Sequence, residues 1–186
     1  MGKSLPHSNI RLPAYDDRLG DRRTRRYTAA FDWVMESIET GHYLEAVAIL
    51  DSLLSDRLAS RYWHIRKQLP TAKDTTGNLC AKLLKGYKLD DNPAVEKDPS
   101  FIAVIEAIWE WTKVRNEAVH ATAKVFSLND PDATFAGAVA KHRTTALVAV
   151  KLLQRFDDLD TADRDKAGEI SATYPNAFFP GRSPRY

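Results

Sequence analysis

The sequence predicts one all-helical domain, a bundle of about five helices with a flexible N-terminal arm and a C-terminal tail. Three observations predict this fold. Apolar residues recur every three or four positions over several long segments, as they do in helices that bury one face. The connections between these segments are short, and no segment alternates polar and apolar residues as a half-buried strand does. The 186 residues also suffice for one hydrophobic core.

Composition and charge narrow the class of protein. The chain is 44% hydrophobic and 28% charged, which is ordinary for a globular domain, and its formal net charge of +2 does not indicate nucleic-acid binding. Cys80 is the single cysteine, so an internal disulfide and a paired-cysteine redox or metal motif are excluded. No apolar run reaches membrane-spanning length, and the first residues lack the apolar segment of a signal peptide. These features predict a soluble, cytoplasmic protein.

Residues 1–23 are predicted to form a basic flexible arm. They combine prolines, glycine and many charges with little helical periodicity. Five arginines gather near the end of this arm, at Arg18, Arg22, Arg23, Arg25 and Arg26. Two interpretations stay open: a solvated arm that leads into a helix, or a patch that attracts phosphates.

Three helices are expected in the first half of the chain. The first covers about 24–40 and ends at Gly41, since glycine readily adopts the backbone conformation that terminates a helix. The second covers about 42–68 and stops before Pro70. The third covers about 75–87. The apolar stripe of the first helix comprises Tyr27, Phe31, Val34, Met35 and Ile38. That of the second comprises Leu44, Val47, Leu50, Leu54, Leu58, Tyr62 and Ile65, and that of the third comprises Leu79, Leu83 and Leu84.

Two further helices each begin at an Asp-Pro pair. Aspartate caps the free N–H groups at the start of a helix, and proline fits the first helical position. Asp98-Pro99 therefore predicts a fourth helix that reaches about Phe126, and Asp130-Pro131 predicts a fifth that reaches about Phe156. The apolar stripe of the fifth helix comprises Phe135, Val139, Ala146, Val150 and Leu153.

The connections and ends complete the predicted domain. Residues 88–97 are expected to form a loop before the fourth helix. The helical bundle is expected to span 24–158. The polar and proline-containing segment 159–186 is expected to form the C-terminal tail.

The fourth helix is amphipathic, but three polar residues interrupt its apolar side. On a helical wheel, Asn116 falls within the apolar stripe, Arg115 on one of its borders and His120 on the other. Burying such side chains without partners costs several kcal/mol. Either the core satisfies them, or this section lines a cleft or a subunit interface. The apolar stripe comprises Phe101, Ile105, Ile108, Trp109, Thr112, Val119, Ala123 and Phe126, and the opposite side holds Glu106, Glu110, Lys113, Glu117 and Lys124.

A cleft at this position would have useful chemistry. A histidine side chain can move protons near neutral pH, and an arginine beside it can hold a phosphate. Asn116 precedes His120 by four residues, so the two are neighbours on the helix surface. Arg115 would use its longer side chain to converge on them.

The segment Arg115-Asn116-Glu117-Ala118-Val119-His120 resembles the Arg-x4-His motif of HEPN domains, in the variant that has Asn after Arg. HEPN domains are small helical bundles that carry this motif on a late helix. The earlier pattern from Tyr43 to Val47, followed by Leu53, Leu54 and Leu58, is also similar to theirs. The resemblance covers about residues 27–156.

The resemblance implies a metal-independent RNA endonuclease without a cofactor. Such proteins act in toxin–antitoxin, abortive-infection and other defence systems, and they commonly form homodimers in which two Arg/His sets share one cleft. By position, His120 would be the acid/base group, Arg115 the phosphate clamp and Asn116 an orienting residue. The implied partners are RNA, a second copy of the chain, and an antitoxin or another regulator.

One departure from the family and two alternatives stay open. A subset of HEPN toxins has a modified Tyr two residues after the His, where this chain has Thr122, so regulation at that position is not expected. Some HEPN domains bind nucleotides or RNA, or only dimerise, without catalysis. An unrelated helical bundle that serves as a protein adaptor is the third reading, and it would bury Asn116 and His120 in the core of one chain.

Other candidate residues are weaker. Gly2-Lys3-Ser4 lacks the glycine loop of a phosphate-binding P-loop. The spacing of His42, His64 and His142 predicts no zinc site.

Two acidic residues and two tryptophans have both a structural and a functional interpretation. Glu45 and Asp51 are either boundary carboxylates or groups that orient His120. Trp109 is expected in the core, although a tryptophan can also stack on a base. Trp111 is expected off the core stripe, where it could support Arg115 by a cation–π contact.

Overall fold

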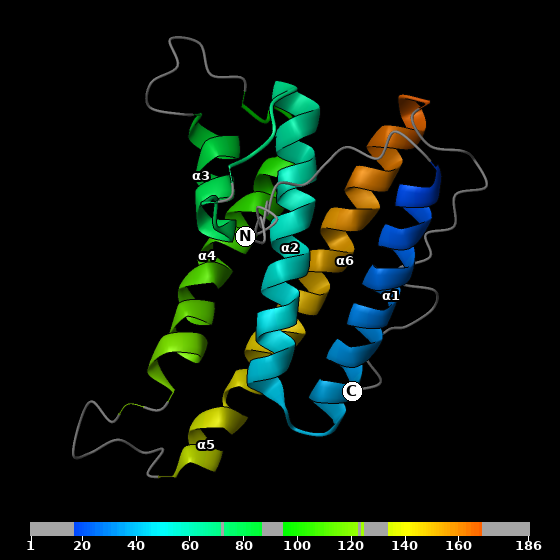
Figure 1. Cartoon of the computed structure of the whole chain (residues 1–186). Coiled ribbons are helices and arrows are strands. Elements are labelled where there is room, and N and C mark those ends of the chain that lie inside the picture. Colours follow the sequence, from blue (N-terminus) through cyan, green and yellow to red (C-terminus); the bar gives the residue numbers. More distant parts are fainter. Residues whose placement is uncertain (1–16, 72, 87–94, 123, 125–133, 169–186) are drawn as a thin grey trace, which may run out of the picture.

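The helices pack as an all-α bundle in the computed structural model (Figure 1), as the sequence predicts. The structure describes residues 17–71, 73–86, 95–122, 124 and 134–168. Within these ranges it contains no strand. The helices are α1 (Asp17–Glu39), α2 (Tyr43–Arg66), α3 (Thr76–Lys85), α4 (Pro99–Ala121), α5 (Phe135–Ala140) and α6 (His142–Lys166).

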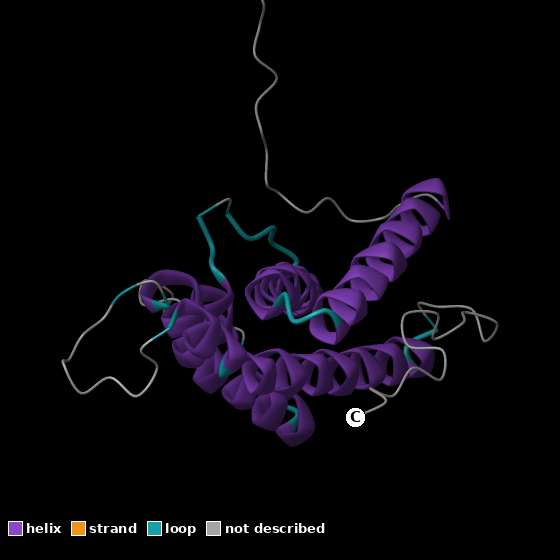
Figure 2. Ribbon diagram, turned by 90° about the horizontal axis from the view of Figure 1, so that it is seen from below, coloured by secondary structure: helices purple, strands orange, loops and turns teal. Residues whose placement is uncertain are grey.

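Helix α2 lies at the centre of the bundle. It packs against α1, α3, α4 and α6, and α6 also runs along α4. The view from below shows α1 to one side of the other helices, next to α2 (Figure 2). The short helix α5 contacts the beginning of α6. This arrangement places the C-terminal half of α4 next to the N-terminal half of α2.

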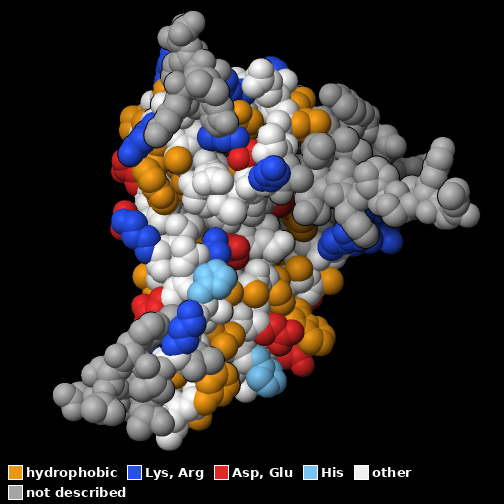
Figure 3. Space-filling model, turned by 60° about the vertical axis from the view of Figure 1, so that its left-hand side comes forward, with side chains coloured by type: hydrophobic (Ala, Val, Ile, Leu, Met, Phe, Trp, Pro, Cys, Tyr) orange, Lys and Arg blue, Asp and Glu red, His pale blue; other side chains and the backbone are white. Residues whose placement is uncertain are grey.

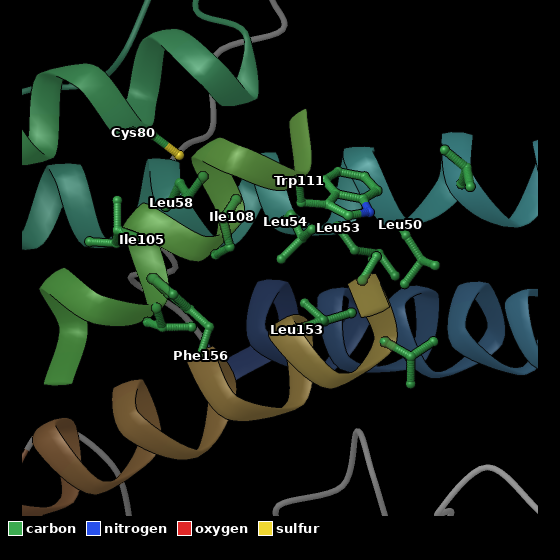
Figure 4. Close-up of a cluster of buried hydrophobic side chains, with 14 of the residues drawn as sticks. Leu50, Leu53, Leu54, Leu58, Cys80, Ile105, Ile108, Trp111, Leu153 and Phe156 are labelled. Carbon is green, nitrogen blue, oxygen red and sulfur yellow. The ribbon is translucent and has the colours of Figure 1, made fainter. Parts of the chain in front are cut away.

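The hydrophobic core surrounds α2 and includes buried side chains of α1, α3, α4 and α6. Four leucines of α2 meet side chains of α4 and α6 there, and Cys80 of α3 lies at one end of the cluster (Figure 4). Complete burial of one such side chain stabilises the fold by roughly 1.5–3 kcal/mol. The residues drawn and labelled are Leu50, Leu53, Leu54, Leu58, Cys80, Ile105, Ile108, Trp111, Leu153 and Phe156.

Local signals in the sequence set several helix ends. The Asp98 carboxylate accepts hydrogen bonds from the backbone N–H groups of Ser100 and Phe101, with Pro99 at the first helical position, so the predicted start of α4 is confirmed. Gly41 has a φ of 86° between α1 and α2, a conformation that costs glycine little.

Two predicted boundaries are wrong at the ends of the domain. Helix α1 begins at Asp17, so 17–23 belong to a helix and not to the arm; 1–16 lie outside the described residues. Helix α6 continues to Lys166, beyond the predicted limit at 158. Both segments consist mainly of charged residues. A helix that packs one side against a neighbour can carry charged residues on its solvent side at little cost in free energy.

The predicted fifth helix is divided into two. Helix α5 ends at Ala140 and α6 begins at His142. The Asp130-Pro131 start signal and Phe126 lie outside the described residues. Phe135 was expected on the buried stripe and is exposed on α5, whereas the later stripe residues Ala146, Val150 and Leu153 are buried as expected.

Ion pairs, two of them buried, join α2 to α6 and to the segment before α4. Arg57 lies 2.7 Å from Asp157. Arg61 donates hydrogen bonds to Glu96, at 2.6 Å from Nε to Oε2, and to Asp163. Desolvation raises the pKa of the Asp157 carboxyl, and the charge of Arg57 opposes that rise. The Arg61–Asp163 pair lies beyond Leu159 of α6 and helps to hold that end of the helix against α2.

Among the described residues, no helix combines the length and the apolar character needed to cross a membrane.

Candidate active site on helix α4

The inward side of α4 is offset from the predicted stripe. Trp111 is buried, and its indole N–H donates to the Thr145 carbonyl oxygen at 2.9 Å. Trp109 is partly buried and packs against the core, so the prediction for Trp109 holds in part and the prediction that Trp111 lies off the core is wrong. Val119, which was expected on the apolar stripe, is 47% exposed. The buried residues of α4 are Phe101, Val104, Ile105, Ile108, Trp111, Thr112 and Ala118.

This offset decides where the candidate residues point. Arg115 lies on the inward side and is half-buried, whereas Asn116 and His120 are exposed. The prediction that all three occupy the inward side is therefore wrong for Asn116 and His120. At 3.6 residues per turn, Arg115 and His120 are separated by about 140° around the helix. Asn116 and His120 lie one turn apart on one exposed side.

The Arg115 guanidinium is held where α2, α3 and α4 meet. Its Nη2 lies 3.1 Å from Oδ1 of Asp51, and the same oxygen accepts a hydrogen bond of 2.7 Å from the Thr76 hydroxyl. The side chains of Arg115 and Asp51 are 14% and 26% exposed. Nε of Arg115 is buried and has no hydrogen-bond partner, and the ion pair with Asp51 is the contact that positions the guanidinium.

The two carboxylates considered as orienting groups serve other side chains. Asp51 pairs with Arg115, and Glu45 accepts a 2.8 Å hydrogen bond from the indole N–H of Trp33 on α1. These contacts agree with the interpretation of both residues as boundary carboxylates and not with that of groups that orient His120. Trp111 packs in the core, where it does not serve as the expected exposed support for Arg115.

The Thr122 side chain links the end of α4 to the start of α6 by hydrogen bonds. Its hydroxyl donates to the Ala118 carbonyl oxygen at 2.5 Å and lies 2.9 Å from Nε2 of the buried His142. Because that hydroxyl hydrogen is already used, Nε2 of His142 acts as the donor in the second contact. The Thr122 oxygen is thus engaged on both sides.

The face that carries α3 and α4 has mixed charge. Lys and Arg side chains alternate with Asp and Glu side chains there, and histidine and hydrophobic side chains lie between them (Figure 3). Lys113 pairs with Glu110, and Lys141 pairs with Glu117 at 3.3 Å. The coloured part of this face therefore carries side chains of both charges and not one broad basic surface.

Sequence reasoning missed the Asp51–Thr76–Arg115 contact. Asp51 and Thr76 are separated by 25 residues, and only the packing of α3 across α2 and α4 brings them together. Their one available signal was the position of Asp51 on the border of the α2 stripe. The chain matches no protein-family model, no curated protein and no solved structure.

Proposed function

We propose that this protein is a metal-independent RNA endonuclease of the HEPN type. The observation that carries the proposal is the motif on the last turns of α4: Asn116 and His120 are open to solvent, and Arg115 is fixed by Asp51. An exposed imidazole can exchange protons with a substrate, and a guanidinium that is already oriented can bind a phosphate without first losing its freedom.

The proposed reaction is an attack of the RNA on its own backbone. The ribose 2′-oxygen forms a bond to phosphorus, the bond to the 5′-oxygen of the next nucleotide breaks, and a cyclic phosphate and a 5′-hydroxyl result. One His120 imidazole removes the 2′ proton and another donates a proton to the leaving oxygen. Such proton transfer contributes roughly 10²–10⁴-fold to the rate. Arg115 stabilises the negative charge on the phosphorane oxygens, and Asn116 orients the substrate.

The proposal includes a homodimer with a composite site. Within one chain Arg115 and His120 point in directions about 140° apart, so one α4 cannot present both to the same phosphate without rearrangement. A second copy can supply the missing member. Val119 is apolar and 47% exposed between them, and a partner helix would cover it. We further propose a toxin or phage-defence role in the cytoplasm, restrained by an antitoxin or another regulator.

A cleavage assay tests the proposed activity. Wild-type protein is incubated with single-stranded RNA in excess EDTA, beside His120→Ala and Arg115→Ala variants whose folding is verified by circular dichroism. We expect wild type to cut the RNA and both variants to lose cutting. Ser100→Ala, which changes an exposed residue of the same helix away from both the motif and the pocket described below, serves as the control. Equal cutting by wild type and His120→Ala would refute the proposal.

A second candidate is a HEPN-like module that binds RNA or nucleotides without cleaving them. It is favoured by one observation, namely that Arg115 is engaged by Asp51 and turned away from His120. Saturable binding of RNA that stays intact, with equal affinity for wild type and His120→Ala, would support this second function. The adaptor reading required Asn116 and His120 to be buried, and both are exposed.

A further inference from the structure

A pocket between α3 and α4 has the dimensions of a small-ligand site. Its volume is about 520 Å³, within the range of roughly 300–1,000 Å³ that is usual for such sites. Its walls are formed by Leu84 and Lys85 of α3 and by four residues of α4, namely Ile102, Glu106, Trp109 and Glu110. The pocket is separate from the Asp51–Arg115 contact.

The aromatic wall of this pocket is suited to a flat ligand. Trp109 is only partly buried, and the Lys85 ammonium lies 4.6 Å from its ring centroid. A tryptophan left partly open gains free energy when a planar group covers it, and base–aromatic stacking is worth about 1–3 kcal/mol per base. The carboxylates of Glu106 and Glu110 at the rim can accept hydrogen bonds from the amino groups of a base.

The register of α4 places this pocket in line with the proposed reaction site. Trp109, Asn116 and His120 fall within about 40° of one another around the helix. The eleven residues from Trp109 to His120 correspond to about 16 Å along the axis. A strand of duplex DNA advances about 3.4 Å per nucleotide, and on that scale this distance corresponds to about five nucleotides. Hydrophobic side chains lie among charged ones on the α3 and α4 face (Figure 3).

We propose that Trp109 and Lys85 form a stacking subsite for an unpaired base of the RNA, within about five nucleotides of the bond cleaved at His120. The base would stack on the Trp109 indole, and the Lys85 ammonium would move from the ring to an adjacent phosphate. This inference rests on the proposed RNA endonuclease function. In this proposal the RNA runs along the exposed side of α4, from the Trp109 pocket to His120.

Binding of a single-stranded RNA dodecamer tests the subsite, in a His120→Ala background that leaves the RNA intact. Trp109→Ala should weaken binding by about 5- to 150-fold, which is the loss of one stacked base. Trp109→Phe, which keeps an aromatic ring, should recover most of that loss. Trp33→Ala removes another tryptophan, 54% exposed on α1, and should leave the affinity unchanged. Melting temperatures show whether each variant is folded.

A scan with abasic nucleotides locates the stacked base. One base is removed at a time over five positions on either side of the cleaved bond. One position should weaken binding to protein that has Trp109 and should have no effect on Trp109→Ala protein. Two results would overturn the proposed subsite. The first is that the folded Trp109→Ala protein binds the dodecamer as tightly as the protein that keeps Trp109. The second is that every abasic position weakens binding to both proteins equally. If wild type still cuts RNA and His120→Ala does not, the endonuclease proposal survives that result; if wild type neither binds nor cuts RNA, both proposals fail.

Discussion

Removing the Asp51–Arg115 pair should cost the fold more than removing a surface ion pair. Two unit charges at the observed 3.1 Å attract by about 5 kcal/mol at an effective dielectric constant of 20, before the cost of desolvating them is counted. Exposed pairs retain only about 0.2–1 kcal/mol after that cost, and a pair that is less exposed to water and salt should retain more of the attraction. Since Arg115 and Asp51 are both mostly buried, we expect a coupling free energy of about 1–2 kcal/mol.

A double-mutant cycle measures this coupling. The free energies of unfolding of wild type, Asp51→Ala, Arg115→Ala and the double variant are obtained from urea titrations. The matched control is the cycle for Glu110 and Lys113, a pair on the same helix whose side chains are 69% and 65% exposed; its coupling should not exceed about 0.5 kcal/mol. Raising NaCl from about 0.1 M to about 1 M should abolish the control coupling and leave most of the first one.

Two results would refute this reasoning. A coupling between Asp51 and Arg115 below about 0.5 kcal/mol would mean that Arg115 is not held by the carboxylate. A coupling that disappears in high salt, as that of the control does, would mean that the pair is solvated. Either result would remove the argument that the guanidinium is oriented before RNA binds.

Three further predictions concern the fold and its titratable groups. Trp111→Phe leaves the Thr145 carbonyl without its indole donor and opens a small cavity, so the free energy of unfolding should fall by about 1–3 kcal/mol in urea titrations; no loss would contradict the core position of Trp111. Burial raises the pKa of the Cys80 thiol to about 12, so Ellman's reagent should react with it only in denaturant, and rapid reaction of the folded protein would show that the core opens there. The hydrogen bond from Arg61 lowers the pKa of Asp163, so wild type should be more stable than Asp163→Asn at neutral pH. The difference in the free energy of unfolding should be less than about 1 kcal/mol, because the Asp163 side chain is 40% exposed. The stability difference should disappear as the pH falls below about 3.9 and then through the lowered pKa of Asp163 in the folded protein, because the carboxylate becomes protonated there. A difference that does not change with pH would show that the charge of Asp163 is not involved.

Much of the fold is encoded in local signals. The helical spacing of Leu50, Leu54 and Leu58 predicts the buried side of α2, and the structure buries all three completely. The Asp98-Pro99 pair predicts the start of α4 because capping acts within one turn. By contrast, the arginines of 17–23 have no apolar spacing, so the first part of α1 could not be recognised from periodicity.

The side of α4 that faces the core could not be chosen from periodicity alone. Trp109 and Trp111 belong to two overlapping stripes that both continue through Ile105 and Ile108. The carbonyl of Thr145, on α6, satisfies the indole of Trp111 and so favours its burial, and this partner is 34 residues away. With Trp111 on the inward side of α4, Arg115 faces inward and His120 faces outward, so the sequence misjudged which of the candidate residues are exposed.

The most direct test of the account is cleavage of an RNA that has one 2′-deoxynucleotide immediately 5′ to the scissile phosphate. The account predicts that the all-ribose strand is cut to a 2′,3′-cyclic phosphate and a 5′-hydroxyl, and that the single missing 2′-hydroxyl prevents cutting at that bond while other bonds are still cut. Continued cutting at the substituted bond, or products with a 5′-phosphate, would contradict the proposed attack of the 2′-oxygen assisted by His120.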